Sequence, residues 1–187
     1  MPADQAISPI DVTVTFLQMD APPSHYPPQP ANRSLALFLT RSMPRHFYRY
    51  LMDRVGRKWH WVNVLRLNND SLDARLGDPA RDISVLYVEG SPAGFFELTM
   101  LAGNTCELTF FGLMPHVSGQ GLGRWFLGAA IDAAWRKQPA RVVVQTCTLD
   151  HPAALPLYQK LGFRPVAQEP GTVTPLSLDE RARILID

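Results

Sequence analysis

The pattern of apolar and polar positions predicts a series of strands. Residues 11–16 alternate polar and apolar side chains, which is typical of a strand with one buried face. Further strands are predicted at residues 83–88, 93–99 and 141–146, and one more begins near Cys106. Turn residues separate the neighbouring strands: Glu89 to Pro92 form one turn, and Gly103-Asn104 form another.

A broad apolar stripe predicts a long helix over residues 124–138. Two rows at i, i+4 spacing form this stripe: Trp125, Ala129 and Ala133, and beside them Phe126, Ala130 and Ala134. Pro139 ends the helix. Because the alanines allow a close approach to strands, these residues are assigned to the core and not to a site.

The N-terminal part is less regular. Five prolines between residues 22 and 30 predict a stiff loop, because proline fits neither a helix interior nor a central strand. Residues 44–55 have a helical pattern, and Ser71 is placed to cap a short helix that runs through Leu76 and ends at Gly77. Without internal repeats, the segments predict an α/β (α+β) fold in which helices flank a mixed sheet, in a single domain over residues 1–187.

Composition narrows the classes of function. A net charge of +1 argues against broad nucleic-acid binding. No apolar run reaches the length of a membrane span and the N-terminus lacks a signal-peptide pattern, so a cytoplasmic protein without a membrane partner is expected. Cys106 and Cys147 lie in apolar strand patterns and are expected to be free thiols. The five histidines lack metal-ligand spacing, so no metal is expected.

The segment from Glu107 to Arg124 carries the most specific chemical signal. A strand, a break at Pro115, a glycine-rich turn and a helix follow one another, an order that points backbone N–H groups at one place where phosphate can bind. A P-loop is excluded because Arg124-Trp125, and not Lys-Ser or Lys-Thr, follows Gly123. The glycine spacing also fits a dinucleotide fingerprint poorly. A tight turn that binds nothing stays an alternative.

Two signatures carry a resemblance to a known family. Residues 118–123, Ser-Gly-Gln-Gly-Leu-Gly, resemble the pyrophosphate loop of the GCN5-related N-acetyltransferases (GNAT), Arg/Gln-x-x-Gly-x-Gly/Ala. After a helix and a strand, residues 151–163 resemble the Asn-x-x-Ala-x-x-Leu-Tyr-x-x-x-Gly-Phe signature of the same family. The resemblance covers about residues 84–166. The chain departs from the family at Ser118, in place of Arg or Gln, and at His151, where Asn is common.

This resemblance implies a GNAT-like, mostly antiparallel sheet and a transfer of acetyl from acetyl-CoA directly to an amine. Residues up to about 80 would face the acceptor, and about residues 81–170 would bind acetyl-CoA. Backbone groups near Leu113 would pair with the pantetheine arm in a gap between splayed strands, and one would polarise the thioester carbonyl. The residues expected to contact the cosubstrate are Leu113, Met114, Pro115, Ser118, Gly119, Gln120, Gly121, Leu122, Gly123, Arg124 and His151.

Tyr158 is the candidate general acid. In the family, the matching tyrosine protonates the departing thiolate, and a hydroxyl with a pKa of about 10 suits that task. Outside the family context, Tyr158 between Leu157 and Leu161 would be expected to be a core residue. His151 could contact the CoA arm, or it and Asp150 could only cap the following helix.

Two glutamates are candidates for the general base that deprotonates the amine. Glu107 stands where histone-type members carry their catalytic glutamate, and strand alternation places it on one face with Thr109 and Phe111. The opposite face would hold Cys106, Leu108 and Phe110. Glu97 lies in an apolar strand, where burial would raise its pKa. Glu107 is placed ahead of Glu97.

The acceptor stays open among protein N-termini, amino acids and small amines. About residues 20–65 would meet it, and this region, which includes Trp59-His60-Trp61, has no acidic cluster to attract a polycation such as an aminoglycoside. The alternative function is a CoA-binding sensor or interaction module without catalysis, which the departures at Ser118 and His151 support. A homodimer is left open.

Overall fold

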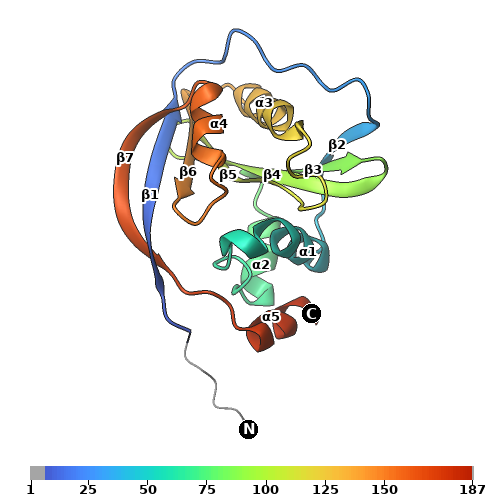
Figure 1. Cartoon of the computed structure of the whole chain (residues 1–187), viewed down its shortest axis with the longest axis vertical. Coiled ribbons are helices and arrows are strands. Elements are labelled where there is room, and N and C mark those ends of the chain that lie inside the picture. The colour runs from blue at the N-terminus through green and yellow to red at the C-terminus, as the bar shows by residue number, and fades with distance from the viewer. Residues whose placement is uncertain (1–6, 187) are drawn as a thin grey trace.

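One mixed sheet of seven strands organises the computed structural model, which describes residues 7–186 (Figure 1). The strand order is β2-β3-β4-β5-β6-β1-β7, and every neighbouring pair is antiparallel except β5 and β6, which are parallel. The mixed, mostly antiparallel sheet expected from the sequence is therefore confirmed. The strands are β1 (Ile10–Met19), β2 (Leu35–Thr40), β3 (Arg81–Val88), β4 (Ser91–Leu101), β5 (Thr105–Leu113), β6 (Arg141–Cys147) and β7 (Arg164–Val173).

Helices cover both faces of the sheet. In Figure 1, α3 and α4 lie on one side, whereas α1, α2 and α5 lie on the other. A 3₁₀ turn, Arg57–Trp59, continues directly from α1. The helices are α1 (Arg45–Gly56), α2 (Asn69–Leu76), α3 (Leu122–Trp135), α4 (Ala154–Lys160) and α5 (Leu178–Ile186).

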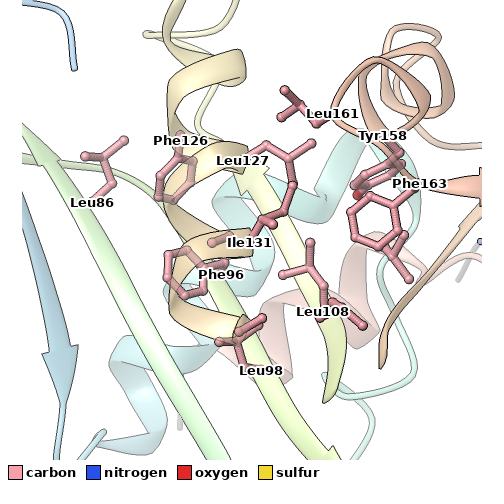
Figure 2. Close-up of a cluster of buried hydrophobic side chains, with 14 of the residues drawn as sticks. Leu86, Phe96, Leu98, Leu108, Phe126, Leu127, Ile131, Tyr158, Leu161 and Phe163 are labelled. Atoms are coloured by element: carbon pink, nitrogen blue, oxygen red, sulfur yellow. The ribbon is translucent and has the colours of Figure 1, made fainter. Parts of the chain in front are cut away.

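Each face of the sheet has its own hydrophobic core. On the α3 face, the helix residues Phe126, Leu127 and Ile131 pack on strand residues that include Leu108, and the side chain of Tyr158 lies beside Phe163 at the α4 end (Figure 2). On the other face, buried side chains of α1 pack on strand residues of β3 and β4. These are Tyr48, Leu51, Met52 and Val55 of α1, and Ile83, Val85 and Phe95 of the strands.

Most of the predicted elements are present, with changed ends. α1 matches the helix expected at residues 44–55. The predicted helix through Leu76 is also present, but its N-cap is Asn68, whose side-chain oxygen accepts a hydrogen bond from the Ser71 N–H at 2.8 Å. The cap predicted at Ser71 is therefore wrong. Sequence patterns did not identify β2, β7 and α5.

A β-bulge in β5 changes which side chains share a face. Leu108 pairs with Leu98 of β4, whereas Phe110 pairs with Glu97, so Thr109 is an extra residue without a partner. Phe110 consequently lies on the α1 face, and the ring of Phe111 packs against Phe126 on the α3 face. The prediction that Phe111 shares a face with Glu107 is wrong, because strict alternation holds only in an unbulged strand.

The parallel strands β5 and β6 separate after a short ladder. Pairing covers Thr105–Leu108 of β5 and Arg141–Val144 of β6, and the two strands then continue to Leu113 and Cys147. Beyond Leu108, the edge of β5 that faces β6 therefore has no strand partner. The gap between splayed strands that was expected from the sequence is present.

Candidate active site

A cavity of about 1210 Å³ opens where β5 and β6 separate. The glycine-rich loop lies at one end, and the segment from Met52 to Val64 forms the wall at the other end. The second half of β5, the end of β6 and the start of α4 lie between these two ends. The predicted site residues that line this cavity are Glu107, Leu113, Pro115, Ser118, Gly119, Gly121, Gly123, Arg124, His151 and Tyr158.

The glycine-rich loop has a backbone that suits an anion. Gly119 and Gly121 have φ angles of 77° and 82°, and Gly121 is the N-cap of α3. A Cβ added at either position would meet no atom within 4 Å, so glycine is favoured there by the backbone angle and not by crowding. The N–H groups of Gly119, Gln120 and Gly121 lie outside helices and strands, and none of them donates to a backbone carbonyl of residues 7–186. These donors and the positive end of α3 favour a phosphate group.

Three of the predicted cosubstrate contacts are buried or bonded within the protein. Met114 is buried, and its N–H donates to the Ala93 carbonyl at 2.7 Å. Leu122 is buried in the core under α3. The Gln120 amide donates to the His116 carbonyl at 2.7 Å, and its oxygen accepts from Arg33 at 2.5 Å. None of these three residues lines the larger cavity.

The proline-rich loop borders a second, smaller cavity of about 510 Å³. Arg124 lines both cavities, and Lys160 at the end of α4 lines the smaller one. The loop approaches α3 closely, because a Cβ added to Gly128 would lie 2.7 Å from Cδ of Pro27. Arg124 of α3 and Lys160 of α4 thus place two cations at the smaller cavity, and Arg124 also reaches the glycine-rich end of the larger one.

Tyr158 combines a packed ring with a position at the cavity wall. Its ring centroid lies 6.4 Å from that of Phe111 and 5.8 Å from that of Phe163. Burial, and secondly the nearby carboxylate of Asp150, raise the pKa of Tyr158 well above its usual value of 10. The hydroxyl is therefore protonated at neutral pH, and among the described residues no protein group forms a hydrogen bond with it.

Glu107 lies half-buried in the cavity wall, and two hydrogen bonds fix its carboxylate. The Thr109 hydroxyl donates to Oε2 at 3.1 Å, and the Gln145 amide donates to Oε1 at 3.1 Å. Both donors come from strands, Thr109 from the bulge of β5 and Gln145 from the splayed end of β6. The structure therefore places Glu107 at the opening between the two strands.

Glu97 lies beneath the cavity and does not line it. The side chain is 0% exposed, and three groups bind its carboxylate. Tyr48 donates at 2.5 Å, Arg81 donates at 2.8 Å, and Arg75 forms a short ion pair. Because protein donors surround it in this way, Glu97 is placed as a structural anion and does not reach an acceptor amine in the cavity.

The cavity wall formed by residues 52–64, here called the acceptor wall because the sequence assigns it to the acceptor, is held by a contact that the sequence did not reveal. Asp150 accepts hydrogen bonds from the Thr146 hydroxyl at 2.8 Å, the Cys147 N–H at 3.0 Å and the Trp61 indole at 3.2 Å. The last of these links the segment after α1 to the end of β6. His151 accepts a hydrogen bond from the Ala153 N–H at 3.0 Å, so it supports the start of α4 while it lines the cavity.

The aromatic segment Trp59-His60-Trp61 lines the cavity opposite α4. The ring of Trp61 lies 5.2 Å from that of Phe110, and the ring of Trp59 lies 5.2 Å from that of His151. Gly112 makes this arrangement possible, because a Cβ there would come within 2.4 Å of Val55 and 3.2 Å of the Trp61 ring. Trp61 thus packs directly against the backbone of β5.

Metal and membrane features can be assessed over residues 7–186. In this range, His, Cys, Asp and Glu form no group of three or more that could hold a metal ion. None of its helices has the length and hydrophobicity of a membrane span. Cys106 and Cys147 are both free, as the sequence predicted.

The family follows from comparison with known proteins. The model of the acetyltransferase (GNAT) family matches residues 40–163, which are about two thirds of the chain, and the chain belongs to this family. Acetyl transfer from acetyl-CoA is the general activity of the family. No curated protein matches the sequence.

Solved structures share the fold at low sequence identity. A protein of Novosphingobium aromaticivorans described as a GNAT acetyltransferase is 16% identical, with a TM-score of 0.60 over 92% of this chain and 69% of its own. A GCN5-related N-acetyltransferase from Kribbella flavida is 17% identical, with a TM-score of 0.57 over 88% and 59%. An IAA acetyltransferase from Bacillus cereus is 19% identical, with a TM-score of 0.52 over 72% and 79%. The chain thus covers 59–79% of the length of these three proteins.

Proposed function

We propose that this protein transfers an acetyl group from acetyl-CoA directly to an amine. The observation that carries the proposal is the continuity of one cavity. It joins the positive-φ glycine loop, the unpaired edge of β5 and the side chains of Tyr158 and Glu107. The pyrophosphate fits at the loop, and the pantetheine arm fits along the unpaired edge of β5. The thioester then lies between the acid and the base.

The reaction needs two proton transfers. The neutral amine nitrogen attacks the thioester carbonyl carbon, so that the C–N bond forms and the C–S bond breaks. Glu107 takes the proton that the amine loses, and Tyr158 supplies a proton to the departing CoA sulfur. Because the pKa of Tyr158 is raised, its hydroxyl carries that proton at neutral pH. Backbone donors near Leu113 stabilise the carbonyl oxygen as it becomes negative.

Direct transfer without an acetyl-enzyme agrees with the state of the two cysteines. Burial raises the pKa of Cys106 to about 11 and also raises the pKa of Cys147, which lines the cavity. Both therefore carry a thiol and not the nucleophilic thiolate at neutral pH. Free thiols are also compatible with a protein that works in the reducing cytoplasm.

The charges of the acceptor wall select among amines. Arg54, Arg57 and Lys58 line this end of the cavity. Asp53 pairs with Arg57 at 2.5 Å and also binds Arg181, so Arg54 and Lys58 carry the charges at this wall that no described carboxylate pairs. The resulting positive potential favours an amine that also carries a carboxylate or phosphate over a polyamine.

The test is a thiol-release assay with acetyl-CoA and matched pairs of amines, alongside calorimetry of acetyl-CoA binding. Each pair contains an amino acid and the amine that lacks its carboxylate, and a polyamine is included. Binding with thiol release, larger for the amino acid of a pair, is the expected result. Binding without release for every amine would favour the sensor function, and no binding of acetyl-CoA would overturn both functions.

A further inference from the structure

A row of polar side chains runs across three strands and ends at Glu107. Arg81 of β3 is the register partner of Thr99 in β4, and Thr99 is the register partner of Glu107 in β5. The bulge inserts Thr109 into this row. Arg81 donates to the Thr99 hydroxyl oxygen at 2.9 Å, the oxygens of Thr99 and Thr109 lie 2.6 Å apart, and the Thr109 oxygen lies 3.1 Å from Oε2 of Glu107.

Elementary hydrogen-bond chemistry gives this row a direction. A guanidinium group only donates, and each threonine hydroxyl has one hydrogen to give. Thr99 must therefore accept from Arg81, and its own hydrogen is free for Thr109. Thr109 in turn has its hydrogen free for Glu107. All three hydrogen bonds form together only when the carboxylate of Glu107 is the final acceptor.

The far end of the row is anchored in the core. Arg81 also donates to the buried Glu97 at 2.8 Å, and Glu97 is held in addition by Tyr48 and Arg75. Thr99 is itself buried. The Arg81 guanidinium is thus fixed in position, and the two hydroxyls extend its charge through the sheet toward the cavity.

We propose that Thr99 and Thr109 are positioning residues for the transfer reaction, which hold the carboxylate of Glu107 in one orientation at the cavity. This inference rests on the proposed function, in which Glu107 accepts the proton of the amine. Thr109 fixes Oε2 and Gln145 fixes Oε1, so the remaining lone pairs have fixed directions. Loss of either hydroxyl leaves the base free to rotate, and misplaced catalytic groups react more slowly.

Variants of Thr109 and Thr99 test the role of the hydroxyls. Thr109→Val keeps the shape of the side chain and removes the hydroxyl, whereas Thr109→Ser keeps the hydroxyl. We expect kcat to fall about tenfold in Thr109→Val, as for loss of a hydrogen bond to a charged group. KM for acetyl-CoA stays unchanged, and Thr109→Ser restores most of the rate. Thr99→Val gives a similar loss although the Thr99 hydroxyl forms its hydrogen bonds with Arg81 and Thr109 and not with Glu107.

Thr105→Val is the matched control on the same strand. The Thr105 hydroxyl meets only the Gly103 carbonyl, at 3.4 Å and outside the row. This variant keeps the wild-type kcat, and urea unfolding of each variant verifies that the protein is folded.

A double variant links the effect to Glu107. In the Glu107→Gln background no base is left to position, so adding Thr109→Val causes little further loss of kcat. A wild-type kcat in Thr109→Val and Thr99→Val would overturn the positioning role. The role would also be overturned if Thr109→Val lowered kcat by the same factor in the Glu107→Gln background as in the wild-type protein. An inactive wild-type protein would instead overturn the proposed function, and this inference with it.

Discussion

Replacing Tyr158 with phenylalanine separates its chemistry from its packing. The ring contacts with Phe111 and Phe163 are kept, and no described protein group binds the hydroxyl. The free energy of unfolding should therefore change by less than about 0.5 kcal/mol, because no protein hydrogen bond is lost. Turnover should fall roughly a hundredfold, the lower end of the usual contribution of a general acid, which corresponds to about 2.7 kcal/mol of barrier height.

Kinetics with two donors provide the assay. Turnover is measured by thiol release with acetyl-CoA and with the acetyl thioester of a more acidic thiol, and acetyl-CoA affinity is measured by calorimetry. The loss should be smaller for the better leaving group, because its thiolate needs less protonation, and affinity should barely change. Since the pKa of Tyr158 lies above 10, the deficit should be the same at pH 7 and pH 9. If Tyr158→Phe lowers turnover equally with both donors, or does not lower it at all, Tyr158 is a core residue and not the general acid.

Four further substitutions test other parts of the site. Gly121→Asp should weaken acetyl-CoA binding at least tenfold, about 1.4 kcal/mol, because it puts a negative charge at the proposed phosphate site. Gly121→Asn has nearly the same size without the charge and should lose much less affinity. Equal affinities of the two variants by calorimetry would contradict the phosphate assignment. Glu107→Gln should slow turnover by about a hundredfold at neutral pH, and the turnover should recover in part at high pH, where the amine is neutral without a base. The same loss of turnover at every pH would argue against a role as general base. Glu97→Gln should lower the free energy of unfolding by about 3 kcal/mol, because two arginines lose their carboxylate partner. Urea titration measures this change. If Glu97→Gln instead shows the pH-dependent rate loss expected of Glu107→Gln, Glu97 and not Glu107 is the general base. Gly112→Ala should cost about 1–3 kcal/mol of stability, because the added methyl group clashes with Val55 and also crowds Trp61. An unchanged Tm would show that this close approach is not needed.

The sequence located the glycine-rich end of the cavity because that end is built from neighbouring residues. The glycines, the break at Pro115 and the start of α3 follow each other in the chain, so their spacing alone implies N–H groups that converge on one point. Tyr158 was singled out from the local Leu-Tyr-x-x-x-Gly-Phe pattern, and Glu107 from its place in the strand that precedes the loop. The helix over 124–138 was also found, since apolar spacing over several turns is a local signal.

The bulge shows where local patterns fail. Alternation assigned Phe111 to the face of Glu107, but a single extra residue, Thr109, moves Phe111 to the α3 face. A bulge is set by how two strands pair, and one strand alone does not contain that information. The short helix α2 shows a smaller error of the same kind, because several residues near its start could cap it and the observed backbone selects Asn68.

The division of roles between the two glutamates depended on tertiary structure. From the sequence, Glu97 and Glu107 are both carboxylates in strands, and both could serve as a base. The partners of Glu97 are Tyr48, Arg75 and Arg81, which lie 49, 22 and 16 residues away in the chain. Only folding brings these groups to one carboxylate and leaves the other at the cavity. The sequence by itself thus determined most of the elements and the glycine-rich loop, whereas long-range contacts decided which acid is enclosed by protein groups and which lines the cavity.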